Sequence, residues 1–127
     1  MKNSYNEWIN RARSSLNIAK ELNHEGIYLE DLCFQAQQAA EKALKAVMIF
    51  LSIRPPCTYN LNTLLLKLNE RIKTTDDISN VLDLNYYAVQ TRYPGNFAPI
   101  EMQEYHNAIK IAESTVNWAE DYINKNS

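Results

Sequence analysis

The residues between 28 and 52 carry the longest helical pattern in the chain, and they restrict the fold more than any other segment. Small or aliphatic side chains recur there every three or four residues, which places them on one side of a helix. They are Leu32, Ala36, Ala39 or Ala40, Ala43, Val47 and Phe50 or Leu51. Because several of them are alanines, a neighbouring helix can approach closely. We therefore predict a central helix over 28–52, which Pro55 and Pro56 cannot continue.

The composition favours a helical protein. The 127 residues include only 2 glycines and 4 prolines, which leaves little room for tight hairpins. Alanine, leucine, lysine, glutamate and glutamine are frequent, and all of them favour helices. A chain of this length buries most of its apolar surface without disulfides or metals. We expect one all-α domain over residues 1–127.

Four further segments show helical periodicity. They are residues 5–22, 61–73, 78–91 (a shorter helix) and 100–123. Ser4 and Glu7 form a capping-box pattern at the start of the helix expected over 5–22. Thr58 or Asn60 is the expected N-terminal cap of the helix over 61–73. Short connections between long amphipathic helices favour antiparallel neighbours. The expected architecture is an up-and-down antiparallel bundle of four main helices plus the shorter one.

Charge and cysteine content limit the possible partners and compartment. The formal net charge of -2 argues against a dedicated duplex-binding protein, although a local basic patch is compatible with it. Cys33 and Cys57 are too few for a disulfide framework. The N-terminal residues lack the apolar core of a signal peptide, and no apolar run reaches membrane-spanning length. We expect a cytoplasmic protein that does not associate with membranes.

The chain lacks the usual sequence signs of a metal or cofactor site. No glycine-rich phosphate loop is present, and the two histidines lie far in sequence from both cysteines. His24 follows a helix end, where a cation interacts favourably with the helix dipole. His106 fits an ordinary surface position early in the last helix. We predict no metal and no cofactor.

Arg92 is the strongest candidate for a functional residue. It lies where the segment at 78–91 ends, and from there its guanidinium can project into a groove and bind phosphate with two hydrogen bonds. The alternative is that it caps helix carbonyls or pairs with a glutamate. Tyr86, Tyr87 and Tyr93 cluster around it in sequence. Such rings can stack on nucleobases or form the core at a bundle end.

Polar residues of the central helix offer a second candidate group. Gln38, Lys42 and Lys45 share one side of the helix, and Glu41 is placed to pair with Lys45. A solvated helix surface explains this pattern. The alternative is a polar groove that faces Arg92.

Several of these segments resemble the HEPN family of small helical proteins. Residues 37–46 (QQAAEKALKA) are similar to the family's central helix. Residues 58–61 stand where many members have Thr-His-Asp/Asn-Leu. Residues 84–87 (LNYY), with 92–94 (RYP), resemble a later helix of the family. The resemblance extends from about residue 5 to residue 122.

The resemblance implies a helical bundle that forms homodimers. Many members cleave RNA without a metal, through an arginine followed after four to six residues by a histidine, and the two copies of this pair meet in the dimer cleft. In bacteria and archaea these proteins are often encoded beside an MNT-type nucleotidyltransferase, as a toxin–antitoxin pair. Arg92 corresponds to the family arginine.

The chain departs from the family pattern where the histidine is expected. Phe97, Ala98 and Pro99 occupy those positions, and none can transfer a proton. Tyr59 also replaces the common histidine of the threonine motif. General acid–base help is worth about 10²–10⁴-fold in rate. Arg92 can still bind phosphate without it, but we expect poor turnover.

Two functions from different classes remain open. The first is a dimeric module that binds nucleotide or RNA, or docks a nucleotidyltransferase, without efficient cleavage. The second is a metal-free ribonuclease toxin that uses Arg92 with an atypical acid–base group, either Tyr93, Tyr87 or His106. A purely structural dimer is a third possibility. The 8 tyrosines, 3 phenylalanines and 2 tryptophans favour a subunit contact in each case. The candidate ligand-binding residues are Arg92, Tyr93, Tyr87, Gln38, Lys42 and Lys45.

Overall fold

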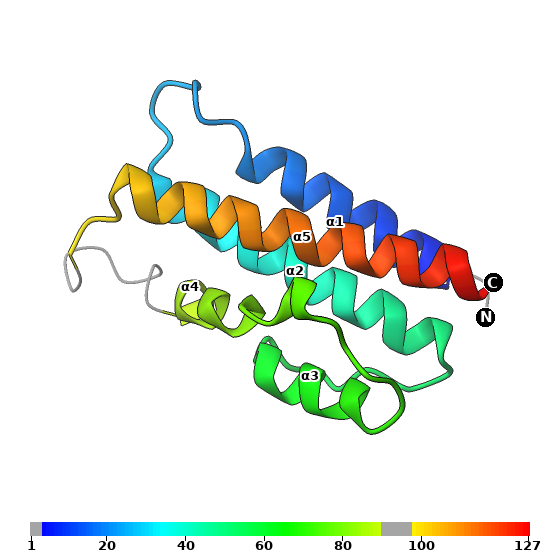
Figure 1. The fold of residues 1–127 in the computed structure, drawn as a ribbon. Coiled ribbons are helices and arrows are strands. Elements are labelled where there is room, and N and C mark those ends of the chain that lie inside the picture. Colours follow the sequence, from blue (N-terminus) through cyan, green and yellow to red (C-terminus); the bar gives the residue numbers. More distant parts are fainter. Residues whose placement is uncertain (1–3, 90–97) are drawn as a thin grey trace.

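A computed structural model describes residues 4–89 and 98–127 of the chain (Figure 1). Arg92 and Tyr93, two of the predicted site residues, lie outside the described residues. Every regular element in the described part is helical, which confirms the all-α class. The elements are α1 (Tyr5–Ala19), α2 (Leu29–Phe50), α3 (Leu61–Asn69), the 3-10 turns η1 (Asp76–Ile78) and η2 (Val81–Asn85), α4 (Tyr86–Val89) and α5 (Met102–Asn126).

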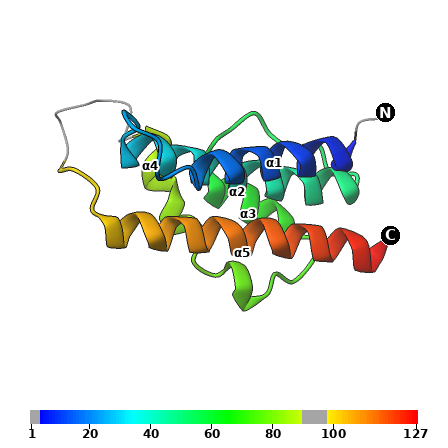
Figure 2. The ribbon, with the colours of Figure 1, turned by 90° about the horizontal axis from the view of Figure 1, so that it is seen from above.

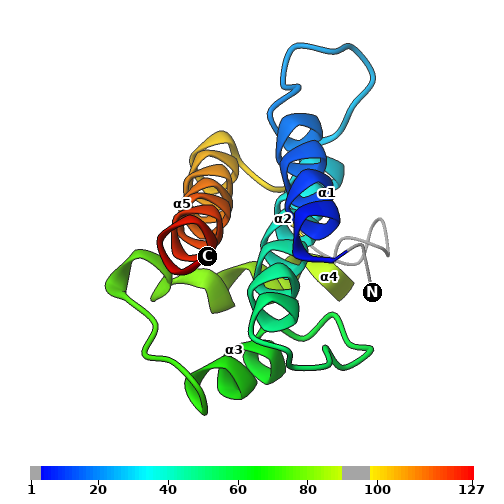
Figure 3. The ribbon, with the colours of Figure 1, turned by 90° about the vertical axis from the view of Figure 1, so that its right-hand side faces the viewer.

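The helix α2 lies at the centre of the bundle and contacts each of the other four α-helices. Its alanine-rich stripe is fully buried, which allows α1 and α5 to pack closely against it. α1 begins and α5 ends at the same end of the molecule (Figure 2). α3 lies on the opposite side of α2 from α1 (Figure 3). The predicted central position of this helix and the up-and-down bundle are both confirmed.

The ends of the helices differ in detail from the predicted ones. Ser4 makes no side-chain capping bond. Glu7 instead pairs with Arg11 at 2.9 Å, so the predicted capping box is wrong. Asn60 does cap α3, because its side chain accepts a hydrogen bond from the Asn62 amide at 3.0 Å. The hydroxyl of Thr58, just before the helix, accepts a hydrogen bond from the backbone amide of Asn60.

The predicted helix over 78–91 is wrong for most of its length. The chain forms η1, η2 and only one turn of α-helix there. Its buried side chains are spaced by three residues, which matches the 3.0 residues per turn of a 3-10 helix and not the 3.6 of an α-helix. Aspartate, asparagine and serine are frequent in the same segment, and their side chains compete for backbone hydrogen bonds. The large buried residues are Ile78, Val81, Leu84 and Tyr87, and the small side chain of Ala88 is buried as well.

Two further bounds follow from contacts between helices. α1 ends at Ala19, three residues earlier than predicted, and the hydroxyl of Tyr105 in α5 donates a hydrogen bond to the Ala19 carbonyl at 2.7 Å. α5 continues to Asn126, three residues beyond the predicted end at residue 123. Among the described residues, no helix is long and apolar enough to span a membrane.

Candidate functional site

The chain on either side of residues 90–97 is held by two carboxylates. On the α4 side, the hydroxyl of Tyr87 donates to Oε2 of Glu104 in α5, at 2.7 Å. On the other side, the amide of Ile100 donates to Oε2 of Glu30 in the first turn of α2, at 3.3 Å. These contacts fix the two points between which the segment with Arg92 runs. Neither carboxylate was predicted, because each contact joins residues that are distant in sequence.

A buried thiol lies beside these carboxylates. Burial, together with the negative charges of Glu104 and Glu30, raises the pKa of the Cys33 thiol to about 12. Burial and the hydrogen bond to Glu104 also raise the pKa of the Tyr87 hydroxyl. Neither group ionises near neutral pH, so neither is a good proton acceptor there. The hydroxyl of Tyr87 therefore acts as a fixed donor to Glu104.

We expect the free energy of unfolding to fall above pH 9 because of Cys33. A thiol whose pKa is raised on folding stabilises the folded state fully below its unfolded pKa, and this contribution is lost as the pH rises toward the folded value. The loss from Cys33 is about 1.4 kcal/mol between pH 8 and pH 10. Urea titrations at both values measure it. In Cys33→Ala the decline is expected to be much smaller, and an equal decline in both proteins would contradict the assignment.

Removing the hydroxyl of Tyr87 is expected to destabilise the fold modestly. Tyr87→Phe loses a hydrogen bond to a charged group, which is worth about 1.5–3 kcal/mol. We expect a value near the lower limit, because Glu104 is exposed to water and can be rehydrated. Urea denaturation measures the loss. Tyr28→Phe is the matched control, since Tyr28 is 72% exposed, and an equal cost in both variants would contradict the role of the bond.

Lys45 of the central helix is buried and not solvated. The residue is 8% exposed. Its Nζ donates to Oε2 of Glu41 at 2.9 Å and lies 5.8 Å from the centre of the Trp8 ring of α1. The predicted pair with Glu41 is confirmed. The solvated-surface interpretation is wrong for Lys45, because spacing within one helix does not reveal the indole that α1 places beside it.

Gln38 and Lys42 are also engaged within the protein. The Nζ of Lys42 donates to the hydroxyl of Ser15 in α1 at 2.9 Å, and burial lowers the pKa of this lysine. The amide of Gln38 donates to Gln37 at 2.9 Å. Gln37, which sequence reasoning missed, is fully buried and donates to the carbonyl of Tyr59 at 2.9 Å. The sequence pattern that could have revealed Gln37 is a polar residue among the small residues of the buried stripe.

The two histidines lie in exposed positions. His106 is in α5, two residues after Glu104, and two residues turn a helix by about 200°. Its side chain therefore leaves α5 on nearly the opposite side from the one that meets Tyr87. His24 lies 3.2 Å from Glu21, and both side chains are exposed. Among residues 4–89 and 98–127, no group of three or more His, Cys, Asp or Glu side chains could hold a metal ion.

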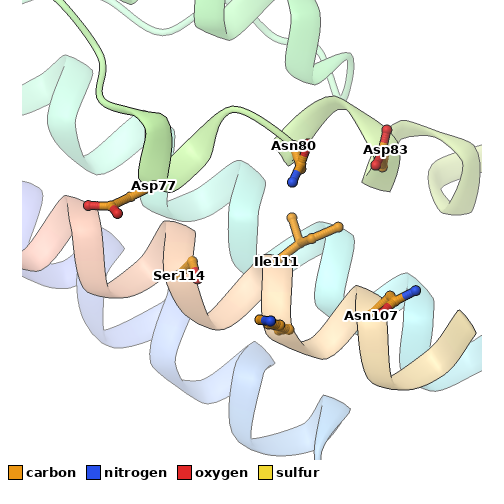
Figure 4. A pocket seen from close by; sticks show the side chains of 7 residues that line it. Asp77, Asn80, Asp83, Asn107, Ile111 and Ser114 are labelled. Atoms are coloured by element: carbon orange, nitrogen blue, oxygen red, sulfur yellow. The ribbon is translucent and has the colours of Figure 1, made fainter. Parts of the chain in front are cut away.

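A polar groove separates the 3-10 segment from α5 (Figure 4). It has a volume of about 350 Å³. An adjoining cavity of about 170 Å³ shares part of its lining and reaches Tyr87 and Glu104. With Glu104, the connected space has three carboxylates and one ammonium group, a balance that disfavours phosphate. The groove is lined by Asp77, Asn80, Asp83, Asn107, Lys110, Ile111 and Ser114.

Comparison with known proteins gives a consistent assignment. The HEPN domain model matches residues 5–122. The crystal structure of TT1696 from Thermus thermophilus is similar, with a TM-score of 0.78 and 27% identity over 92% of this chain and 96% of that chain. ST0689, an archaeal HEPN homologue, has a TM-score of 0.74 and 28% identity over 97% of this chain and 99% of its own.

No curated protein matches the sequence. The family model, however, covers far more than half of the chain, and the similar structures have the same helical fold over nearly their whole length. This chain therefore belongs to the HEPN domain family.

Proposed function

We propose that the chain is a homodimeric module of a toxin–antitoxin-like system in the cytoplasm. It binds nucleotide or RNA, or docks an MNT-type nucleotidyltransferase, and it does not cleave RNA efficiently. Arg92 is the residue that holds the phosphate. It lies three residues after the end of α4 in sequence, between the anchored positions Tyr87 and Ile100.

The chemistry around α4 supports binding over cleavage. Cleavage needs a group that exchanges a proton near neutral pH. The raised pKa of Tyr87 makes that hydroxyl unsuitable, and His106 leaves α5 on nearly the opposite side from Glu104. The proposal therefore depends on the unsuitability of two of the three candidate acid–base groups, Tyr87 and His106, whereas the third, Tyr93, lies outside the described residues.

Exposed apolar side chains support the dimer. Large apolar residues at a protein surface are typical of interfaces, and aromatic residues are enriched there. Equilibrium sedimentation at micromolar concentration is expected to give twice the chain mass, and a monomer would contradict the proposal. The exposed residues include Ile18, Tyr59, Leu82, Tyr86 and Met102.

Arg92→Ala is expected to weaken binding of single-stranded RNA about 10- to 100-fold, because a hydrogen bond to a charged group is worth about 1.5–3 kcal/mol. Fluorescence anisotropy with a labelled oligoribonucleotide measures the affinity. Arg54→Ala is the matched control, because Arg54 is an exposed arginine in the loop after α2.

The same RNA, incubated without metal, tests the alternative function. We expect no cleavage by the wild type. Cleavage that disappears in Arg92→Ala would overturn the binding-only proposal and establish the ribonuclease. If the wild type, Arg92→Ala and Arg54→Ala bind RNA with equal affinity, the proposed role of Arg92 in binding phosphate is wrong.

A further inference from the structure

The C-terminal end of α3 forms a second polar hollow, which differs from the α5 groove in charge. We call it the α3 hollow. Its volume is about 510 Å³. Two cationic side chains line it, and no carboxylate from the described part of the chain does. Its lining residues are Asn69, Arg71, Ile72, Lys73 and Thr74.

The backbone of the α3 hollow is fixed by local hydrogen bonds. The carbonyl of Leu68 accepts from the amides of both Arg71 and Ile72, each at 2.9 Å. The hydroxyl of Thr74 donates to Oδ1 of Asn69 at 3.1 Å. Ile72 packs against the hydrophobic core. The turn is therefore held in place before any ligand arrives, which lowers the entropic cost of binding.

The cations of the α3 hollow are not neutralised. Among the residues that the structure describes, neither Arg71 nor Lys73 forms an ion pair, and both are exposed. Asp77, a nearby carboxylate in sequence, lines the α5 groove instead. Several cations of α1 and α2 are neutralised within the protein. Those pairs are Arg11–Glu7, Arg13–Glu120, Lys20–Glu113 and Lys45–Glu41.

We propose that the α3 hollow binds a phosphate group of an RNA strand through Arg71 and Lys73. A guanidinium, an ammonium group and a fixed polar turn together suit a tetrahedral anion. In a chain with a net charge of -2, a local cationic hollow also lowers the repulsion that an anionic strand meets. The RNA strand as ligand rests on the proposed function, whereas the phosphate contact does not.

The position of the α3 hollow suits a strand that also reaches the start of α4. The amide of Leu61, at the start of α3, donates to Asn85 beside α4 at 2.8 Å. α3 has nine residues, so the hollow at its C-terminal end lies about 13 Å from its start along the helix axis. At about 3.4 Å per nucleotide of a helical strand, this distance corresponds to roughly four nucleotides.

The test compares two double variants that each lose one arginine and one lysine. Arg71→Ala/Lys73→Ala is expected to weaken binding of a labelled oligouridylate about tenfold or more at low salt. The slope of log K against log salt should fall by about 0.7, because contact with one phosphate of a single strand contributes about that much. The control is Arg54→Ala/Lys125→Ala, which removes two exposed cations elsewhere on the surface.

Each outcome supports or overturns phosphate binding in the α3 hollow. An equal loss of affinity in both double variants would overturn the proposal, as would RNA binding that depends on Arg92 but not on Arg71 and Lys73. In the latter case the proposed function stands. If the wild type binds no RNA, the RNA-binding part of the proposed function fails, and an NMR titration with inorganic phosphate tests the hollow alone. Shifts of the amide signals of residues 69–74 that vanish in Arg71→Ala/Lys73→Ala support the hollow, and their absence overturns it.

Discussion

Glu41→Gln is expected to lower the free energy of unfolding by about 3 kcal/mol. Glu41 and Lys45 are paired at 2.9 Å, and their side chains are only 13% and 10% exposed. The substitution keeps the size of the side chain but leaves a buried ammonium group without its counterion. We expect the lower end of the usual range of about 3–5 kcal/mol, because the indole of Trp8 still faces the ammonium group.

The chain supplies a matched control for this prediction. Glu7 and Arg11 in α1 have the same spacing and the same 2.9 Å separation, but their side chains are 49% and 64% exposed. Glu7→Gln should cost about 0.5 kcal/mol or less, since exposed pairs contribute little. Urea denaturation of both variants at neutral pH measures the difference. Equal costs would show that burial does not govern the Glu41–Lys45 pair.

A third variant separates pairing from packing. Glu41→Leu/Lys45→Met replaces the ion pair by apolar side chains of similar volume, which is often neutral or stabilising. We therefore expect this double variant to be more stable than Glu41→Gln. If it is less stable, the hydrogen bond that Glu41 accepts from Gln38 at 3.3 Å contributes more than the pair itself.

The long helices could be predicted from the sequence because their signal is local. The spacing of small residues in α2 predicted both the helix and its central position, and the spacing of Glu41 and Lys45 predicted their pair. Burial of that pair could not be predicted, because it depends on Trp8 from another helix. The segment at 78–91 was misassigned although its pattern was visible. Its buried residues recur at intervals of three, and this regularity indicates 3-10 geometry.

The candidate site could be predicted only in part. Arg92 and Tyr87 follow from local sequence and from the family resemblance. The anchors Glu104 and Glu30 depend on contacts across 17 and 70 residues, which no spacing rule gives. The α3 hollow escaped notice for a related reason. Glu70 directly precedes Arg71 in sequence, and only the turn after α3 shows that this glutamate is not part of the lining.

Leu44→Ala is expected to destabilise the protein by about 3 kcal/mol, within the range of about 2–5 kcal/mol for a buried leucine. Leu44 lies in α2 and is fully buried. It belongs to the hydrophobic core cluster, to which α1, α2, α3 and α5 all contribute, so the cavity cannot close easily. Leu66 in α3 is 59% exposed and provides the control. Leu66→Ala should change stability by about 0.5 kcal/mol or less.

Urea denaturation of both leucine variants distinguishes a central α2 from a peripheral one. The slope of unfolding free energy against urea should stay unchanged, because neither substitution alters how much surface the unfolded chain exposes. A small cost for Leu44→Ala would mean that the bundle relaxes into the space of the lost side chain. That result would contradict the close packing of α1 and α5 on α2, on which the placement of Glu30 beside Ile100 and of Glu104 beside Tyr87 depends.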